Sequence, residues 1–218
     1  MRALVIFDWD GTLMDSMPRI VASMQAAARD MGLEVPEETR VHGVVGLGLP
    51  EAIASLFPGI EQDALERLRQ YYARHYIEGE RVPSRLFPGA AEMLDGLRAR
   101  GVGMAVATGK SRRGLERVWR HSGLGRYFVT SRCSDESISK PDPAMVTAIL
   151  RETRVAPEQA LVVGDTTFDM EMARRADVAR VGVTWGAHEP ELLMNHSPLA
   201  LVDEMHELME FLHEQWRP

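Results

Sequence analysis

Three continuous apolar runs, each ended by a polar turn, constrain the fold of this chain more than any other feature of its sequence. They span residues 4–7, 102–107 and 160–163, and a weaker fourth run spans residues 178–183. A short apolar run without alternation is typical of a strand that is buried on both faces. We therefore expect these runs to form strands of one sheet.

Helical patterns separate the expected strands, at residues 90–100, 112–121, 143–153 and 168–175. The first pattern ends at Gly101 and the second near Gly123, and glycine commonly follows the last residue of a helix. Strands that alternate with helices predict a parallel sheet with helices on both faces. The expected fold class is therefore α/β, with a Rossmann-like, doubly wound core.

The segment after the first strand predicts helices and lacks a convincing buried strand. Ser16 can cap a helix that has Pro18 in its first turn and stops at Gly32. Two more helices are expected at residues 51–57 and 62–76, separated by proline and glycine turn residues. This segment is therefore expected to form a small helical unit.

The predicted domain organisation follows from the position of this helical segment. Residues 16–85 are expected to form a helical domain that is inserted into an α/β core of residues 1–15 and 86–218. A chain of 218 residues is long enough to bury such a core and a smaller inserted domain.

Composition argues against several classes of partner. The formal net charge of -7 and the isoelectric point near 5.5 disfavour nucleic acid, whose binding requires clustered lysine and arginine. No uncharged apolar stretch is long enough to span a bilayer, and the one cysteine, Cys133, cannot form an internal disulfide. We therefore expect a cytoplasmic protein that acts on a small molecule, as a monomer or a homodimer.

Two carboxylates follow the first expected strand, at Asp8 and Asp10. Because they are two residues apart, both can point to one side while Trp9 points toward the core. Gly11 permits a tight turn, and the amides after it could bind an anion. In a doubly wound sheet, ligands bind just beyond the carboxyl ends of the strands. An ordinary aspartate-rich surface turn would explain the same residues, so this motif alone does not decide.

Two further motifs precede helices. Thr108 and Gly109 end the second strand, and the N-terminus of the helix that follows attracts phosphate. Lys140 comes before the next helix and is held by the rigid Pro141. Each motif is also what a plain helix start contains. Lys110 follows the first of them and is expected to be a solvated residue at the helix start. Lys110 and Lys140 are the only lysines in the chain, and the rest of its 25 lysine and arginine residues are arginines.

Asp165 and Asp169 place two more carboxylates after the third strand, one at its tip and one a helical turn later. Hard oxygen ligands of this kind, together with phosphate and water, are what Mg²⁺ prefers. Helix capping by Asp165 and a dipole contact from Asp169 would explain either residue singly. They do not explain why three strands end in groups suited to one phosphate and one Mg²⁺ ion.

Together these motifs resemble the four motifs of the haloacid dehalogenase superfamily, in the same order and at similar separations over nearly the entire chain. The helical insertion after the first motif resembles the cap of the phosphoglycolate phosphatase-like branch. Trp9 departs from the leucine or methionine usual at its position, and we expect no change in chemistry from it. The residues that carry the resemblance are Asp8 to Leu13, Thr108 with Gly109, Lys140 with Pro141, and Gly164 with Asp165 and Asp169.

The resemblance implies a magnesium-dependent phosphatase acting on a small phosphorylated metabolite. Asp8 would attack phosphorus to form an aspartyl phosphate, and Asp10 would protonate the leaving alcohol and then activate water. Mg²⁺ would be held by the carboxylates of Asp8 and Asp165 and by the backbone carbonyl of Asp10. Thr108 would bind phosphate oxygens, and Lys140 would neutralise charge and hold the nucleophile.

The resemblance also implies supporting contacts. Asp169 would orient metal-bound water or Lys140. Phosphoglycolate is the first candidate substrate, by family likeness. Contacts with the substrate are expected at Gly11, Thr12, Gly109, Gly46 and Gly48. Further cap residues that could choose the leaving group are Arg19, His42, Arg74 and His75, although each can equally be an ordinary surface or packing residue.

Several other functions share parts of this pattern. A haloacid dehalogenase does not need Asp10, and a phosphonate hydrolase of this superfamily needs a cap lysine, which residues 16–85 do not contain. A phosphomutase or a pyrophosphatase shares the same core motifs and stays open. A protein that binds phosphate esters without turnover is an alternative because a fold does not determine a function, but it is disfavoured, since a decayed site would be expected to lose Asp8, Asp10 or Lys140 and all three are present.

Overall fold

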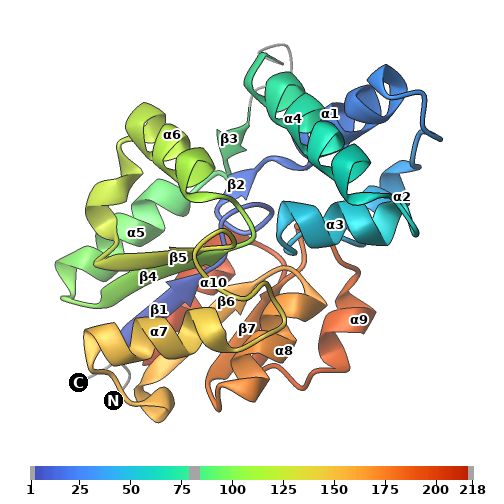
Figure 1. Ribbon diagram of the computed structural model, residues 1–218. Helices are drawn as coiled ribbons and strands as arrows, with labels where there is room; N and C mark the ends of the chain where they lie inside the picture. The colour runs from blue at the N-terminus through green and yellow to red at the C-terminus, as the bar shows by residue number, and fades with distance from the viewer. Residues whose placement is uncertain (1–2, 79–83, 216–218) are drawn as a thin grey trace.

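The computed structural model describes residues 3–78 and 84–215, in which helices cover both faces of a parallel sheet (Figure 1). Its six strands lie in the order β5-β4-β1-β6-β7-β8. They are β1 (Leu4–Phe7), β4 (Gly103–Thr108), β5 (Thr130–Cys133), β6 (Ala160–Gly164), β7 (Ala179–Val183) and β8 (Ala200–Val202). All neighbours pair in parallel, which confirms the predicted α/β class.

Helices on the two faces follow the strands in the expected alternation. Those of the core are α5 (Ala90–Ala99), α6 (Arg112–Ser122), α7 (Ala144–Thr153), α8 (Thr167–Arg175), α9 (Pro190–Met194) and α10 (Met205–Gln215). Two short 3-10 turns, η1 (Leu124–Tyr127) and η2 (Pro157–Gln159), complete the connections. Among the helices that the structure describes, none combines the length and apolar character needed to cross a membrane.

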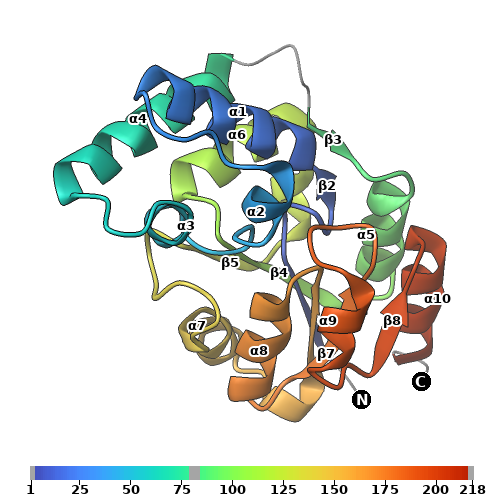
Figure 2. The same cartoon turned by 90° about the vertical axis from the view of Figure 1, so that its right-hand side faces the viewer.

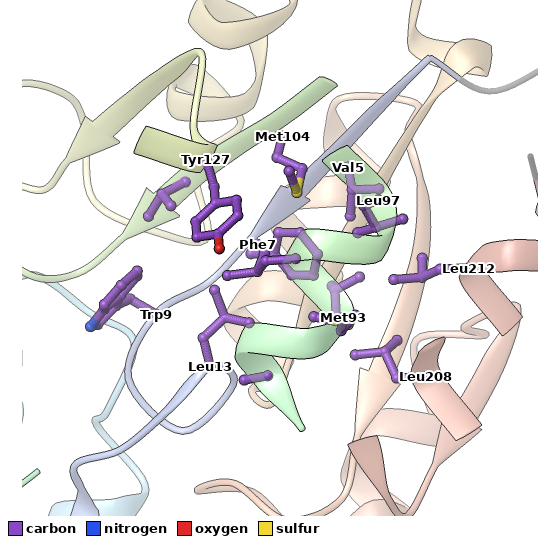
Figure 3. Close-up of a cluster of buried hydrophobic side chains, with 14 of the residues drawn as sticks. Val5, Phe7, Trp9, Leu13, Met93, Leu97, Met104, Tyr127, Leu208 and Leu212 are labelled. Atoms are coloured by element: carbon purple, nitrogen blue, oxygen red, sulfur yellow. The ribbon is translucent and has the colours of Figure 1, made fainter. Parts of the chain in front are cut away.

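The side chains of β1 alternate between two buried layers. Val5 and Phe7 pack with residues of α5 and α10, as Figure 3 shows. Leu4 and Ile6 belong to a second cluster, with residues of α7 and α8. Successive side chains of a strand point to opposite faces, so one apolar run supplies both layers. The end of β1 is therefore held firmly at the centre of the sheet.

Trp9 anchors the turn that follows β1. Its side chain is fully buried, and its ring meets Trp119 and Phe128 edge to face, with centroids 6.3 and 6.0 Å away. Edge-to-face contacts of this kind are favourable for aromatic pairs. The expectation that Trp9 faces the core is confirmed, and its burial turns the side chains on either side of it away from the core.

Four helices follow the first strand and enclose a hydrophobic cluster of their own, which we call the cap cluster. The helices are α1 (Met17–Asp30), α2 (Glu38–His42), α3 (Leu49–Leu56) and α4 (Gln62–Glu78). The cap cluster includes Val21, Met24, Val41, Ile53 and Leu68. Figure 2 shows these helices beyond the end of the sheet at which β1 stops.

The chain leaves and re-enters the core through two short strands, β2 (Met14–Asp15) and β3 (Arg85–Leu86), which pair antiparallel. This pairing lies at the boundaries proposed for the inserted domain. The division into residues 16–85 and the rest stays a prediction, and residues 1–2, 79–83 and 216–218 of the predicted ranges lie outside the described residues.

Several elements were not predicted from the sequence: β5, β8, α2, α9 and α10. β5 reads Thr-Ser-Arg-Cys, and only alternate residues are buried, because it lies at one edge of the sheet. β8 lies at the other edge and has three residues. The continuous apolar signal is typical of strands that are buried on both faces, so it is missing from β5, whereas residues 199–202, which contain β8, do form an apolar run.

Candidate active site

Three adjacent central strands have their carboxyl ends at the same end of the sheet, next to the four inserted helices (Figure 2). Asp8 directly follows β1, Thr108 is the last residue of β4, and Asp165 directly follows β6. β1 lies between β4 and β6. The topology therefore brings together polar residues that are far apart in the sequence.

A buried ion-pair network surrounds Asp8. Lys140 Nζ lies 2.8 Å from Asp8 Oδ1 and 2.6 Å from Asp169 Oδ1. Lys140 is 1% exposed, and the two aspartates are 2% and 0% exposed. An ammonium group is rarely buried this deeply unless it is paired. Lys140 therefore binds the residue after β1 to the first turn of α8.

The carboxylates of Asp169 and Asp165 are held by hydrogen bonds. Asp169 Oδ2 accepts hydrogen bonds from the amide and the hydroxyl of Thr166, at 3.1 and 2.6 Å, and so forms a capping box at the start of α8. Asp165 Oδ1 accepts from the Thr12 hydroxyl at 2.7 Å, and Oδ2 accepts from the Ala187 amide at 2.8 Å. These two carboxylates are therefore fixed in orientation before any ligand arrives.

The balance of buried charge is negative at this site. Oxygens of Asp8, Asp165 and Asp169 all lie within 4.8 Å of one another, and Lys140 is the cation in contact with two of them. Three carboxylates and one ammonium leave a formal charge of about -2 in a region that water hardly reaches. One divalent cation would compensate for this charge.

The pKa values of these groups reflect the same excess of buried negative charge. Burial is the main cause that raises the pKa of Asp8 to about 7, and the ion pair with Lys140 only partly opposes it. Burial, followed by the charge of Asp8, raises the pKa of Asp165 well above its ordinary value. Burial disfavours the charged form of Lys140, but the carboxylates of Asp169 and Asp8 outweigh it and raise the lysine pKa. A bound cation would favour the ionised carboxylates.

The donor set fits Mg²⁺. Asp8, Asp165 and Asp169 are clustered and buried carboxylates, and carboxylate oxygens are the donors that this hard cation prefers. Apart from its ion pair with Lys140, Asp8 accepts no side-chain hydrogen bond from the part of the chain that the structure describes. Its carboxylate therefore keeps acceptor capacity for a cation or an electrophile. Asp169 has both oxygens engaged, by Lys140 and Thr166.

Asp10 forms a second ion pair, with Lys110. Lys110 Nζ lies 2.9 Å from Asp10 Oδ2 and donates a hydrogen bond to Tyr76 Oη at 3.3 Å. The lysine side chain is 9% exposed, so the expectation of a solvated residue was wrong. Burial opposes its charge, but the Asp10 carboxylate raises the pKa of Lys110. Lys110 therefore joins the core carboxylate of Asp10 to the cap helix α4.

Ser16 lies at the N-cap position of α1, but its side chain makes no capping hydrogen bond. Its hydroxyl donates instead to Asp10 Oδ1 at 2.6 Å. The predicted helix start is correct, and the predicted use of the hydroxyl is wrong, because the side chain is turned toward the Asp10 carboxylate and accepts no hydrogen bond from the first amides of α1. Asp10 is consequently held on both oxygens, by Ser16 and by Lys110.

The segment between α2 and α3 lies very close to the core, and glycines occupy the points of contact. A Cβ atom on Gly109 would lie 2.4 Å from Leu47 O and 2.6 Å from Gly46 O. Gly46 has a φ of +98°, and a Cβ there would lie 3.0 Å from Thr166 Oγ1. The Gly48 amide donates to the Ser139 hydroxyl at 2.7 Å. Close approach of the two backbones is possible only because these positions lack side chains.

Gly11 and Thr12 contact Asp165 directly. Gly11 has a φ of +84°, and a Cβ there would lie 2.2 Å from Asp165 Oδ2. The Thr12 hydroxyl donates to the same carboxylate. These two residues, predicted as substrate contacts, thus shape the turn that supports Asp165.

A cavity of about 390 Å³ opens beside the carboxylates, between the core and the inserted helices. Of the predicted site residues, Asp8, Asp10, Thr108, Gly109 and Gly46 line it. Lys140, Asp165, Asp169, Gly48, Gly11 and Thr12 do not line it, and they lie behind or beside the residues that do.

The four further cap residues named from the sequence do not line this cavity either. Arg19 donates to the Tyr76 carbonyl and lies over its ring, and His42 lies near Glu38. Arg74 and His75 both contact Asp30, at 2.6 and 2.7 Å. Their packing and surface roles are therefore the interpretation that the structure favours.

Sequence reasoning missed Tyr72 and Tyr76 and placed Lys110 in solvent, although all three residues line the cavity beside Asp10. The rings of Tyr72 and Tyr76 lie 5.8 Å apart, and Lys110 Nζ lies 4.8 Å from the centre of the Tyr76 ring. The scarcity of lysine in the sequence is a signal that could have pointed to Lys110. The chain uses lysine twice, and both lysines are ion-paired to the two aspartates after β1.

Known proteins with similar sequences and structures identify the family of this chain. The family described as haloacid dehalogenase-like hydrolase matches residues 5–183. The probable phosphatase IndB of Dickeya dadantii is 33% identical, with 98% of this chain and 94% of that protein covered. The phosphoglycolate phosphatase of Vibrio parahaemolyticus is 27% identical over 95% of this chain and 94% of that protein. A hydrolase from Pseudomonas syringae, 25% identical, superposes with a TM-score of 0.87 over 98% of this chain and 99% of that one. The chain belongs to the haloacid dehalogenase-like hydrolase family.

Proposed function

We propose that this protein is a magnesium-dependent phosphatase that hydrolyses the phosphate monoester of a small metabolite through an aspartyl phosphate on Asp8. The observation that carries the proposal is the charge of the buried cluster. Asp8, Asp165 and Asp169 outnumber their one contacting ammonium, and the cluster borders a cavity. Such a site suits one divalent cation and one phosphoryl group.

Asp8 is the nucleophile in this proposal. Its carboxylate lines the cavity, and Lys140 holds it by an ion pair at 2.8 Å. One carboxylate oxygen attacks phosphorus, the bond from phosphorus to the leaving oxygen breaks, and an aspartyl phosphate results. Asp8 and Asp165, with the Asp10 carbonyl, would hold Mg²⁺, which supplies positive charge between two groups that otherwise repel each other.

Asp10 is the general acid and base. It lines the same cavity, two residues after the nucleophile, and Ser16 and Lys110 hold its two oxygens. In the first step it gives a proton to the leaving alcohol. In the second it accepts a proton from the water that attacks phosphorus, so phosphate is released and Asp8 is regenerated.

Phosphate oxygens would be bound at the end of β4. Thr108 and Gly109 line the cavity beside Asp8, directly before the N-terminus of α6. A hydroxyl and backbone amides in this position are suited to bind an anion. Asp169 fixes Lys140 from behind at 2.6 Å and therefore acts through it.

Phosphoglycolate is a candidate substrate because a relative of similar length is named a phosphoglycolate phosphatase. A pyrophosphatase, a phosphomutase and a binding protein without turnover are the alternatives. Each predicts a different fate of the phosphoryl group, so one set of assays separates them.

The test is the release of p-nitrophenol from p-nitrophenyl phosphate with Mg²⁺ and with EDTA, for the wild type and for Asp8→Asn. Asp63→Asn is the matched control, because Asp63 is exposed in α4 and lies away from the cavity. We expect turnover that requires Mg²⁺, is lost in Asp8→Asn and is kept in Asp63→Asn.

Other outcomes would contradict the proposal. Full turnover by Asp8→Asn would remove the nucleophile from the mechanism. Retention of labelled phosphate on an organic product would indicate a mutase, and strong preference for pyrophosphate would indicate a pyrophosphatase. Absence of turnover with every ester tested would favour a binding protein.

A further inference from the structure

The cavity beside Asp8 and Asp10 has two unlike walls. The core wall carries polar and charged groups, among them Lys110, Arg113 and Arg117. The cap wall is largely apolar, and its side chains include Ile20, Met24, Val44, Val45, Leu47 and Leu49. The phosphoryl position and the apolar wall therefore belong to one continuous space.

The apolar wall comes from several separate elements. Ile20 and Met24 lie on α1, Val44 and Val45 follow α2, and Ile77 lies near the end of α4. Val44 and Met24 are also members of the cap cluster, so the cavity extends to the hydrophobic interior of the cap. An apolar surface collected from different helices around one cavity is a property of a ligand site rather than of a single amphipathic helix.

The size of the cavity bears on the ligand. A volume of about 390 Å³ lies within the range of pockets that bury ligands of many heavy atoms, roughly 300–1,000 Å³. A glycolate leaving group has only two carbon atoms, one of which belongs to its carboxylate. It would leave most of the apolar wall in contact with water.

Aromatic rings complete the cap side. Tyr72 and Tyr76 stand one helical turn apart on α4, with tilted rings, and both line the cavity. Burial raises the pKa of Tyr72, which agrees with a hydroxyl in a poorly hydrated place. A ring and an aliphatic wall both favour carbon-rich ligands.

We infer that the substrate is a phosphate monoester whose leaving alcohol has an apolar body of several carbon atoms, which contacts the cap wall while phosphorus lies at Asp8. This inference rests on the proposed phosphatase function and names its substrate class. The cap then favours the ester by burying the carbon chain, and the core performs the chemistry. Burial of each methylene contributes a similar favourable free energy.

A series of unbranched alkyl phosphates tests the inference. From propyl to hexyl phosphate the leaving alcohols have similar acidity, so the chemical step stays alike while apolar area increases. We expect kcat/KM to rise with every methylene, by up to about fourfold each, the factor that complete burial would produce. Hexyl phosphate should also be a better substrate than phosphoglycolate.

Two isoleucine variants test whether the cap wall causes the gain in kcat/KM per methylene. Ile77 lines the cavity and is 42% exposed, whereas Ile138 is 64% exposed and does not line it. Ile77→Asn should reduce the gain in kcat/KM per methylene, and Ile138→Asn should leave that gain unchanged. Because the gain is a ratio within one variant, a general loss of activity does not alter it.

The outcomes separate this inference from the proposed function. Values of kcat/KM that stay flat or fall with chain length, or a preference for phosphoglycolate over hexyl phosphate, would overturn the inferred substrate class. An equal loss of the methylene gain in Ile77→Asn and Ile138→Asn would overturn the assignment to the cap wall. Mg²⁺-dependent hydrolysis of p-nitrophenyl phosphate that needs Asp8 would still stand in either case.

Discussion

Replacing Lys140 by methionine is the perturbation with the largest calculable effect. The variant keeps the length of the side chain but removes the ammonium group that contacts Asp8 and Asp169 at 2.8 and 2.6 Å. Both carboxylates are almost completely buried, so water cannot replace the lost partner. The metal-free variant therefore has to accommodate unpaired buried charge.

The magnitude follows from the burial of the pair. Removal of one partner of a buried ion pair costs about 3–5 kcal/mol of unfolding free energy. In a protein of 218 residues each kcal/mol shifts Tm by about 2–4 °C. Metal-free Lys140→Met should therefore melt about 6–20 °C below the wild type at pH 8.

Circular dichroism melting in EDTA is the assay, with Arg69→Met as the control. Arg69 contacts Glu66 at 2.9 Å, and both side chains are largely exposed, so solvent screening makes the pair weak. The control should melt close to the wild type. Mg²⁺ should recover part of the loss in Lys140→Met, because it replaces the missing positive charge. Acidification to pH 5 should also recover part of it, because the carboxyl groups then bind protons.

Two results would refute this reasoning. If Lys140→Met melts within about 2 °C of the wild type, corresponding to less than about 1 kcal/mol, the cluster does not need the ammonium charge. If its Tm falls at pH 5 relative to pH 8 by more than that of the wild type, unpaired carboxylates are not the cause of the loss.

Three further predictions concern the same site. In EDTA the unfolding free energy of the wild type should fall as pH rises from about 5 to about 8, because the native Asp8 carboxyl, with a pKa of about 7, binds a proton that the unfolded chain has released, and the raised pKa of Asp165 acts in the same direction; urea unfolding of Asp8→Asn should show a smaller slope than the wild type. Lys110→Met should lower kcat of p-nitrophenyl phosphate hydrolysis by roughly tenfold and change its pH profile, because Asp10 loses an ion pair at 2.9 Å; an unchanged profile would contradict a positioning role. Gly109→Ala should lower kcat/KM by at least about tenfold, because a Cβ there meets the cap backbone at 2.4 Å, whereas Gly43→Ala, with nothing nearer than 3.6 Å, should not.

The central strands and most helices could be predicted because their signals are local. β1, β4 and β6 are buried on both faces, so an unbroken apolar run marks each of them. The edge strand β5 carries no such signal, because half of its surroundings is solvent or loop, whereas the other edge strand, β8, lies in an apolar run at residues 199–202 that was not used for the prediction. The length and the burial of an edge strand depend on the segments that pack beside it in the tertiary structure.

The residues at the strand ends could be proposed for a related reason. Asp8, Thr108 and Asp165 each follow or end a central strand, and parallel strands of one sheet end at one edge. The partner of Lys110 could not be proposed in this way. Local sequence places this lysine at a helix start, where solvent is its usual partner, and nothing nearby indicates Asp10 or Tyr76.

The amino-acid sequence by itself determined the α/β class, the helical insertion and the set of polar residues at the strand ends, because side-chain periodicity and chain order are one-dimensional properties. Only the tertiary structure decided which of these groups share a buried volume, that Lys110 pairs with Asp10, and that an apolar cap wall faces the carboxylates. The physical reason is that charge pairing and burial depend on distances through space, and these appear only when the core and the cap pack against each other.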